Sequence, residues 1–171
     1  MSKTLPVAHD ALEQWLIDEG VVDGVNRLSN DEKAVVLQLK IMLAAGDLRS
    51  LLGVEKIERY RFEFSVQDGR IDLLLFHADG GVSIVEAKPD TNPVSVAAGI
   101  GQLCYYAAAL PSKYPKGKQP AYINRFLCAP VKPERSLVLM AACEMAGVKF
   151  VHLAPIAVFK ARIDALKNKS T

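Results

Sequence analysis

The stretch RIDLLLFHADGGVSIVEAK, residues 70–88, decides the fold, because two apolar segments in it flank a short segment rich in turn-forming residues. Residues 70–76 and 82–88 have the length and composition of buried strands, and HADGG at 77–81 is typical of a turn. The stretch therefore predicts a β-hairpin.

A five-residue loop at 77–81 fixes the pairing of this hairpin, because opposed residues then have numbers that sum to 158. Phe76 should face Val82, Leu74 should face Ile84, and Asp72 should face Glu86, with Cβ atoms about 4.5–5.5 Å apart in each pair. Lys88 falls on the same face as Glu86, two residues further along the strand. The hairpin thus predicts two carboxylates and an ammonium group at one end of an apolar sheet.

Two opposed carboxylates repel each other unless a proton or a cation lies between them. Hard oxygen ligands with open positions suit Mg²⁺ or Mn²⁺, which keep several waters and bind substrate phosphates. A nearby lysine can polarise or deprotonate an attacking water, or stabilise charge on a phosphoryl group. The alternative is structural, with Asp72 solvated while Glu86 and Lys88 neutralise each other.

The segment after the hairpin predicts a helix from Pro93 to about Leu110. Gln102 and Tyr106 stand four residues apart and project from one face of this helix. The small residues that precede them predict a close approach to the sheet: Ala97, Ala98, Gly99 and Gly101. Either polar side chain could then touch a phosphate, a water or the lysine, or simply pin the helix to the sheet.

The remaining segments complete a single domain, 1–171. Residues 1–50 are expected to be helical, 55–155 to form the core, and 156–171 to form a last helix and tail. Alternating polar and apolar residues at 56–66 predict a strand before the hairpin, and further strands are expected at 121–129 and 148–153 with a helix at 132–147. This order predicts an α/β fold of the α+β type, a mixed sheet flanked by helices.

Composition is that of an ordinary globular domain, with 50% hydrophobic residues, 23% charged residues and a formal net charge of +2. Three separate cysteines in apolar contexts predict buried thiols and no disulfide or zinc site: Cys104, Cys128 and Cys143. We expect no signal peptide, no membrane-spanning run and an intracellular, cytoplasmic location.

GRID at 69–72, EAK at 86–88 and QLCYY at 102–106 follow in the order that resembles the PD-(D/E)xK nuclease superfamily, in particular its RecB-like branch. The motifs cover residues 55–110, and the element order out to about 155 suits the family's restriction-endonuclease-like αβββαβ core, here with extra N-terminal helices. The resemblance implies a metal-dependent nuclease that hydrolyses DNA phosphodiester bonds, structure-specifically or non-specifically, in DNA repair or recombination.

The resemblance also implies roles for individual residues. Asp72, Glu86 and the backbone carbonyl of Ala87 would hold Mg²⁺ or Mn²⁺, and Lys88 would act on the nucleophilic water. Gln102 and Tyr106 match the helix motif and would position the substrate or the lysine. An earlier acidic residue of the family corresponds first to Glu63, with Glu32 and Glu58 as alternatives.

Basic residues in the later segments are candidates for contacts with a phosphate backbone: Lys113, Lys116, Lys118 and Arg125. DNA is the expected partner, RNA is left open, and so are a homodimer and a protein partner for targeting. Two other functions stay open. One is a catalytically inactive module of this fold that binds nucleic acid or protein, and the other is an unrelated small-ligand protein.

Overall fold

A computed structural model describes residues 32–54, 56–130 and 133–154, and the helices expected before residue 30 and after residue 155 lie outside these ranges. The described elements are α3 Glu32–Ala45, α4 Asp47–Leu52, β1 Ile57–Val66, β2 Gly69–His77, β3 Val82–Ala87, α5 Pro93–Ala109, η2 Leu110–Lys113, β4 Ile123–Pro130, α6 Pro133–Met145 and β5 Lys149–Leu153.

The strands form one five-stranded sheet in the order β1-β2-β3-β4-β5. β1, β2 and β3 pair antiparallel, whereas β4 and β5 run parallel to β3. α5 and α6 supply the crossovers that parallel strands require. The mixed sheet flanked by helices and the αβββαβ order of its elements are therefore confirmed.

The predicted hairpin register is also confirmed, since Phe76 pairs with Val82 and Leu74 pairs with Ile84. The turn is closed by the His77 amide, which donates to the carbonyl of Gly81 at 3.0 Å.

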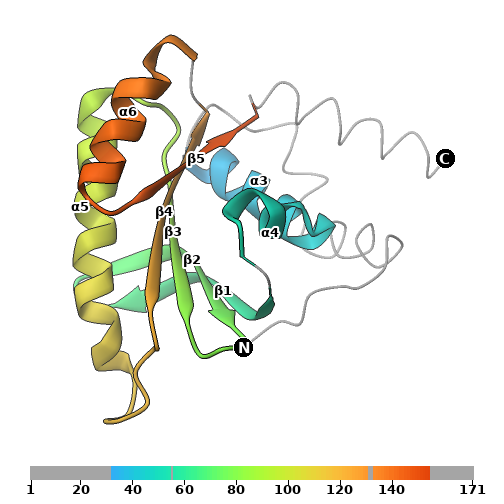
Figure 1. The fold of residues 1–171 in the computed structure, drawn as a ribbon, viewed down its shortest axis with the longest axis vertical. Helices are drawn as coiled ribbons and strands as arrows, with labels where there is room; N and C mark the ends of the chain where they lie inside the picture. The colour runs from blue at the N-terminus through green and yellow to red at the C-terminus, as the bar shows by residue number, and fades with distance from the viewer. Residues whose placement is uncertain (1–31, 55, 131–132, 155–171) are drawn as a thin grey trace, which may run out of the picture.

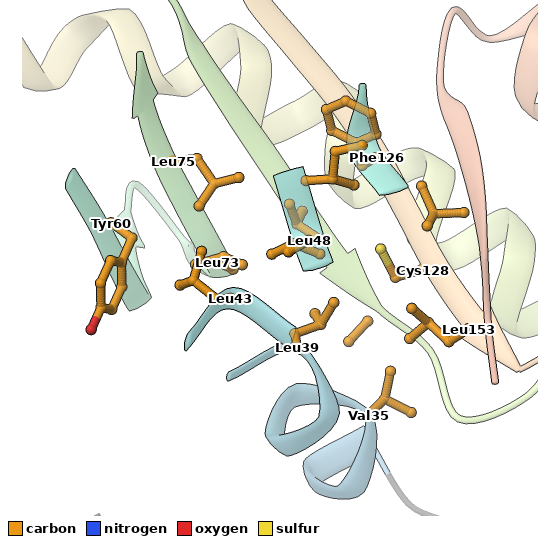
Figure 2. Close-up of a cluster of buried hydrophobic side chains, with 14 of the residues drawn as sticks. Val35, Leu39, Leu43, Leu48, Tyr60, Leu73, Leu75, Phe126, Cys128 and Leu153 are labelled. Carbon is orange, nitrogen blue, oxygen red and sulfur yellow. The ribbon is translucent and has the colours of Figure 1, made fainter. Parts of the chain in front are cut away.

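α3 and α4 lie on one side of the sheet and α5 and α6 on the other (Figure 1). Each face carries its own hydrophobic core. On one face, Val35, Leu39 and Leu43 of α3 point toward the side chains of β2, β4 and β5 (Figure 2). On the other face, Leu103 of α5 and Leu139 of α6 cover the sheet. Burying one such leucine stabilises a fold by roughly 1.5–3 kcal/mol, so both helical layers hold the sheet firmly.

The β1–β2 hairpin changes face at Glu63, which has a positive φ of 53°. Tyr60 and Phe62 belong to the α3 core, yet Phe64 and Val66 belong to the α5 core. Regular alternation would keep all four on one face, so the strand turns over between Phe62 and Phe64. The hairpin tip consequently reaches toward α5 (Figure 1).

One helix has the length and composition of a membrane-spanning segment, although the sequence was expected to contain no such run. Pro93–Lys113, which is α5 with η2, is long and apolar enough to cross a membrane, with 21 residues and a mean hydropathy of 1.3. In this protein the helix packs on the sheet through Val96, Leu103, Tyr106 and Leu110, all of them buried. The packing covers part of the apolar segment, because 28% of it is buried and residues such as Val94 are exposed.

Candidate active site

The site begins where β2 and β3 separate. The hydrogen-bonded ladder between these strands ends at the pair of Leu73 and Val85. The predicted pair of Asp72 and Glu86, which would come next in the same register, is therefore not formed. Instead, Asp72 Oδ2 accepts a hydrogen bond from the Ala87 amide at 2.7 Å. The aspartate thus takes the place of a backbone partner and lies between the two strands.

Glu86 and Lys88 form a buried ion pair at the end of β3, with Nζ donating to Glu86 Oε1 at 2.7 Å. Glu86 is 1% exposed and Lys88 is 7% exposed. The other carboxylate oxygen, Glu86 Oε2, is buried without a hydrogen-bond partner in the part of the chain described. Such an orphaned oxygen normally costs about 1–3 kcal/mol or more, and a cation would satisfy it.

A third acidic group reaches the pair from the start of α3. Glu32 Oε2 lies 3.7 Å from Lys88 Nζ, although the side chain of Glu32 is 52% exposed. The family resemblance gave Glu63 first place as the upstream acid, with Glu32 and Glu58 as alternatives. The contact of Glu32 with Lys88 joins residues 56 positions apart (88 − 32), so no local pattern indicates it. The structure therefore brings Glu32, and not Glu63, beside the lysine.

Burial raises the pKa of both carboxyl groups that the motif supplies. For Glu86 burial and the nearby charge of Asp72 together raise the pKa to about 7, against the opposing effect of Lys88. For Asp72 burial outweighs the Ala87 hydrogen bond that favours its ionised form. Burial would lower the pKa of Lys88, but the hydrogen bond and charge of Glu86 outweigh it and raise that pKa. Negative charge is thus in excess here, and the lysine is held as the ammonium.

The position where α5 begins brings this helix next to the site. Asn92 caps the helix, its Oδ1 accepting from the amides of Val94 and Ser95 at 3.0 and 2.9 Å. Pro93, which is suited to the first helical position, follows at once. Gly99 then faces the lysine stem, since a Cβ there would lie 3.3 Å from Lys88 Cε. The expected close approach occurs at Gly99 and not at Gly101, which has open space around its Cα.

Gln102 and Tyr106 lie on α5 beyond Gly99, and Gln102 Nε2 donates to the Tyr106 hydroxyl at 3.4 Å. The ring of Tyr106 lies over Gly69 at the start of β2, where a Cβ would come within 2.6 Å of it. Gln102 Oε1 is buried with no hydrogen-bond partner among the residues described. The pair holds the hairpin tip against α5 and leaves one amide oxygen free to accept.

Two groups of predicted residues are not brought to this site. Glu63 is exposed and pairs with Arg70 at 3.7 Å, because the strand turns over at its position. Glu58 is exposed elsewhere on β1.

The lysine-rich loop lies at the other end of β3, where the Ala121 amide donates to the Gly80 carbonyl. Its three lysines are exposed there: Lys113, Lys116 and Lys118. Arg125 is half-buried and donates to Cys104 Sγ at 3.3 Å, so its guanidinium is already engaged by α5.

The donor set fits a divalent metal of the Mg²⁺ type. No group of three or more His, Cys, Asp or Glu side chains converges within residues 32–54, 56–130 and 133–154. Asp72 and Glu86 are the two carboxylates that could serve as side-chain donors here, and Mg²⁺ is commonly bound by one or two carboxylates with waters and phosphates. The orphaned Glu86 Oε2 supplies an oxygen for such an ion.

Comparison with known proteins assigns no family to the chain. No family model matches the chain, and no curated protein matches it. A repair endonuclease from Pyrococcus abyssi is similar in structure, with 19% identity over 65% of this chain and a TM-score of 0.44. The EndoMS–dsDNA2 complex is similar as well, with 18% identity over 75% of this chain and a TM-score of 0.48. The chain spans 46% of the length of each of those chains.

Proposed function

We propose that the protein is a metal-dependent nuclease that hydrolyses DNA phosphodiester bonds, of the RecB-like PD-(D/E)xK type, and structure-specific or non-specific. The observation that carries this proposal is the buried Glu86, which pairs with Lys88 through one carboxylate oxygen and leaves the other unpaired, while the charge of Asp72 raises its pKa. Buried acids that repel each other beside a lysine are costly to fold, so a functional reason for them is expected.

Asp72 and Glu86 would hold Mg²⁺ or Mn²⁺, with the Ala87 carbonyl as a further predicted ligand. When bound, the ion would supply Lewis-acid polarisation of a phosphoryl oxygen and orientation of the substrate. Lys88, fixed by Glu86 and by its stem against Gly99, would direct its ammonium toward the ion and its substrate. In that form it orients the attacking water by donating to it, or stabilises the negative charge that develops on the phosphoryl group.

The direct test is cleavage of labelled single-stranded, duplex and branched DNA with Mg²⁺ or Mn²⁺. Asp72→Asn keeps an oxygen for the Ala87 amide but removes the charge, and Lys88→Ala removes the ammonium. We expect each to lower the cleavage rate by about 10²-fold or more, as loss of a preorganised charge at a transition state does. Asp68→Asn and Lys56→Ala, at exposed positions, are the matched controls and should cleave like wild type.

The alternative, a catalytically inactive module that binds nucleic acid or protein, makes a different prediction. It gives no metal-dependent cleavage on any of the three substrates, and Asp72→Asn then binds DNA as well as wild type does. Cleavage that persists in excess EDTA would also contradict the proposal.

A further inference from the structure

Two arginines on β1 carry charges that no acidic side chain neutralises in the part of the chain described. Arg59 and Arg61 are both exposed, and neither is in an ion pair there, since Glu63 on the same strand is engaged by Arg70. They stand two residues apart, so they project from the same face of the strand.

Each guanidinium lies over an aromatic ring of the α5 core. Arg59 lies over Phe76 with 4.8 Å to the ring centroid, and Arg61 lies over Phe64 with 5.7 Å. Phe64 is on this face only because the strand turns over at Glu63. A guanidinium stacked on a ring is already ordered, and its N–H edges remain available to grip a phosphate in a bidentate manner.

Tyr114 joins this surface from the loop after α5, and its ring packs against the same core. Its hydroxyl is buried with no hydrogen-bond partner among the residues described. Burial raises the pKa of Tyr114, and the charges of Arg59 and Arg61 act in the opposite direction. The adjoining loop adds exposed positive charge at Lys113 and Lys116.

The surface lies on the same side of the sheet as the candidate active site. Val82 and Ile84 belong to the α5 core, so Glu86 continues along that face. Arg61 pairs with Leu74 and Arg59 pairs with Phe76, two and four residues along β2 from Asp72. These steps correspond to about 7 and 13 Å of strand, or about two to four nucleotides at the rise of one DNA strand.

We infer that Arg59 and Arg61, on the face of the sheet that Tyr114 also packs against, form a binding surface for the phosphodiester backbone of DNA flanking the bond to be cut. This inference rests on the proposed function, which supplies the reason for a phosphate chain at this position. It differs from the lysine-loop expectation, because the stacked arginines on β1 are its anchors. Arg125 is excluded from the surface, since Cys104 engages it.

The test is DNA affinity measured in EDTA by fluorescence anisotropy, on duplex and single-stranded DNA over a range of salt concentrations. We expect the Arg59→Ala/Arg61→Ala double variant to bind at least tenfold more weakly than wild type. The slope of log affinity against log salt should fall by about 1.8 for duplex or about 1.4 for single strands, the value for two lost phosphate contacts. Arg59→Lys/Arg61→Lys should keep the slope, because both positive charges remain at these positions.

The matched control removes two exposed charges elsewhere, with Arg49→Ala in α4 and Lys56→Ala before β1. The inference is overturned if the Arg59→Ala/Arg61→Ala variant binds DNA as tightly as the Arg49→Ala/Lys56→Ala control does. It is also overturned if wild type binds no DNA. Because the assay omits metal, its result is independent of cleavage. Cleavage with unchanged binding by the Arg59→Ala/Arg61→Ala variant would reject the surface alone, and weaker binding without any cleavage would reject the nuclease alone.

Discussion

Glu86 is buried beside a second carboxylate, and its protonation is therefore linked to folding. Its pKa is about 7 in the folded protein against an ordinary 4.5, so between these values the folded state binds more protons than the unfolded state. The free energy of unfolding of the metal-free protein should then fall as pH rises from about 4.5 to about 7, by on the order of 3 kcal/mol. Urea unfolding in EDTA at pH 5 and pH 7.5 measures this loss.

Other groups titrate in the same window, so the comparison that matters is with Glu86→Gln. The glutamine side chain of this variant cannot ionise. The free energy of unfolding of the variant should therefore depend less on pH than that of wild type, by the amount assigned to Glu86. Lys88 contributes no slope here, because its raised pKa lies above an ordinary value of 10.5. Equal slopes for wild type and Glu86→Gln would show that the carboxyl is not perturbed by its surroundings.

Glu63 illustrates a position where the backbone, not the side chain, decides the effect of a substitution. Its φ of 53° is left-handed, which costs most residues roughly 1–2 kcal/mol but costs glycine little. We expect Glu63→Gly to be more stable than Glu63→Ala by about 1 kcal/mol, the reverse of the usual order in a strand. Urea unfolding of the two variants decides this.

The same two variants also test whether Glu63 serves as an acidic ligand. Its side chain is exposed and paired with Arg70, so we expect metal-dependent cleavage to be unchanged in both. A large loss of cleavage in Glu63→Ala would mean that the glutamate reaches the metal in the complex with DNA.

At the scale of elements, α5 carries two glycines two residues apart with opposite surroundings. Gly101 has open space, so Gly101→Ala should stabilise the protein by about 1 kcal/mol through helix propensity, with cleavage unchanged. A Cβ at Gly99 would lie 2.6 Å from Leu127 Cδ1, a fully buried side chain, and would press on the stem of Lys88. Gly99→Ala should therefore gain no stability and should lower the cleavage rate by roughly tenfold or more.

Thermal unfolding and initial cleavage rates on the two glycine variants separate positioning from stability. If Gly99→Ala is stabilised like Gly101→Ala and cleaves like wild type, α5 does not position the lysine.

The elements themselves were largely predictable, and the reasons are local. Short-range patterns predict these elements: the alternation at 56–66 predicts β1, and the apolar runs on either side of HADGG predict β2 and β3. Pro93 predicts the start of α5. The bounds of all four elements in the structure lie close to the predicted ones. The hairpin register also followed from loop length, as the Phe76–Val82 pair shows. Asp72 and Glu86 were placed correctly at one end of the hairpin for this reason.

The details that failed depend on long-range packing. The hairpin must turn over at Glu63 to bring Gly69 against Tyr106. No local sequence pattern predicts that a glutamate adopts the left-handed backbone conformation required there. The β2–β3 ladder also ends before Asp72, which is therefore not paired with Glu86, and the Asp72 carboxylate accepts a hydrogen bond from the Ala87 amide. The approach of Glu32 to Lys88 requires α3 to be seated on the sheet first.

For the whole molecule, the site is a point of local instability that a metal would correct. The two cores hold β2 and β3 from opposite faces, and the carboxylates lie where these strands separate. An ion that binds the folded state alone stabilises it by about 2.7 kcal/mol at a hundredfold excess over its dissociation constant.

We expect Mn²⁺ or Mg²⁺ to raise the thermal unfolding midpoint of wild type, most strongly at pH 7.5, where Asp72 and Glu86 are most ionised. Asp72→Asn and Glu86→Gln should lose this rise while unfolding cooperatively, whereas Asp68→Asn should keep it. An equal rise in all four proteins would place the metal elsewhere on the surface and would remove the link between Glu86, its unpaired oxygen and the proposed chemistry.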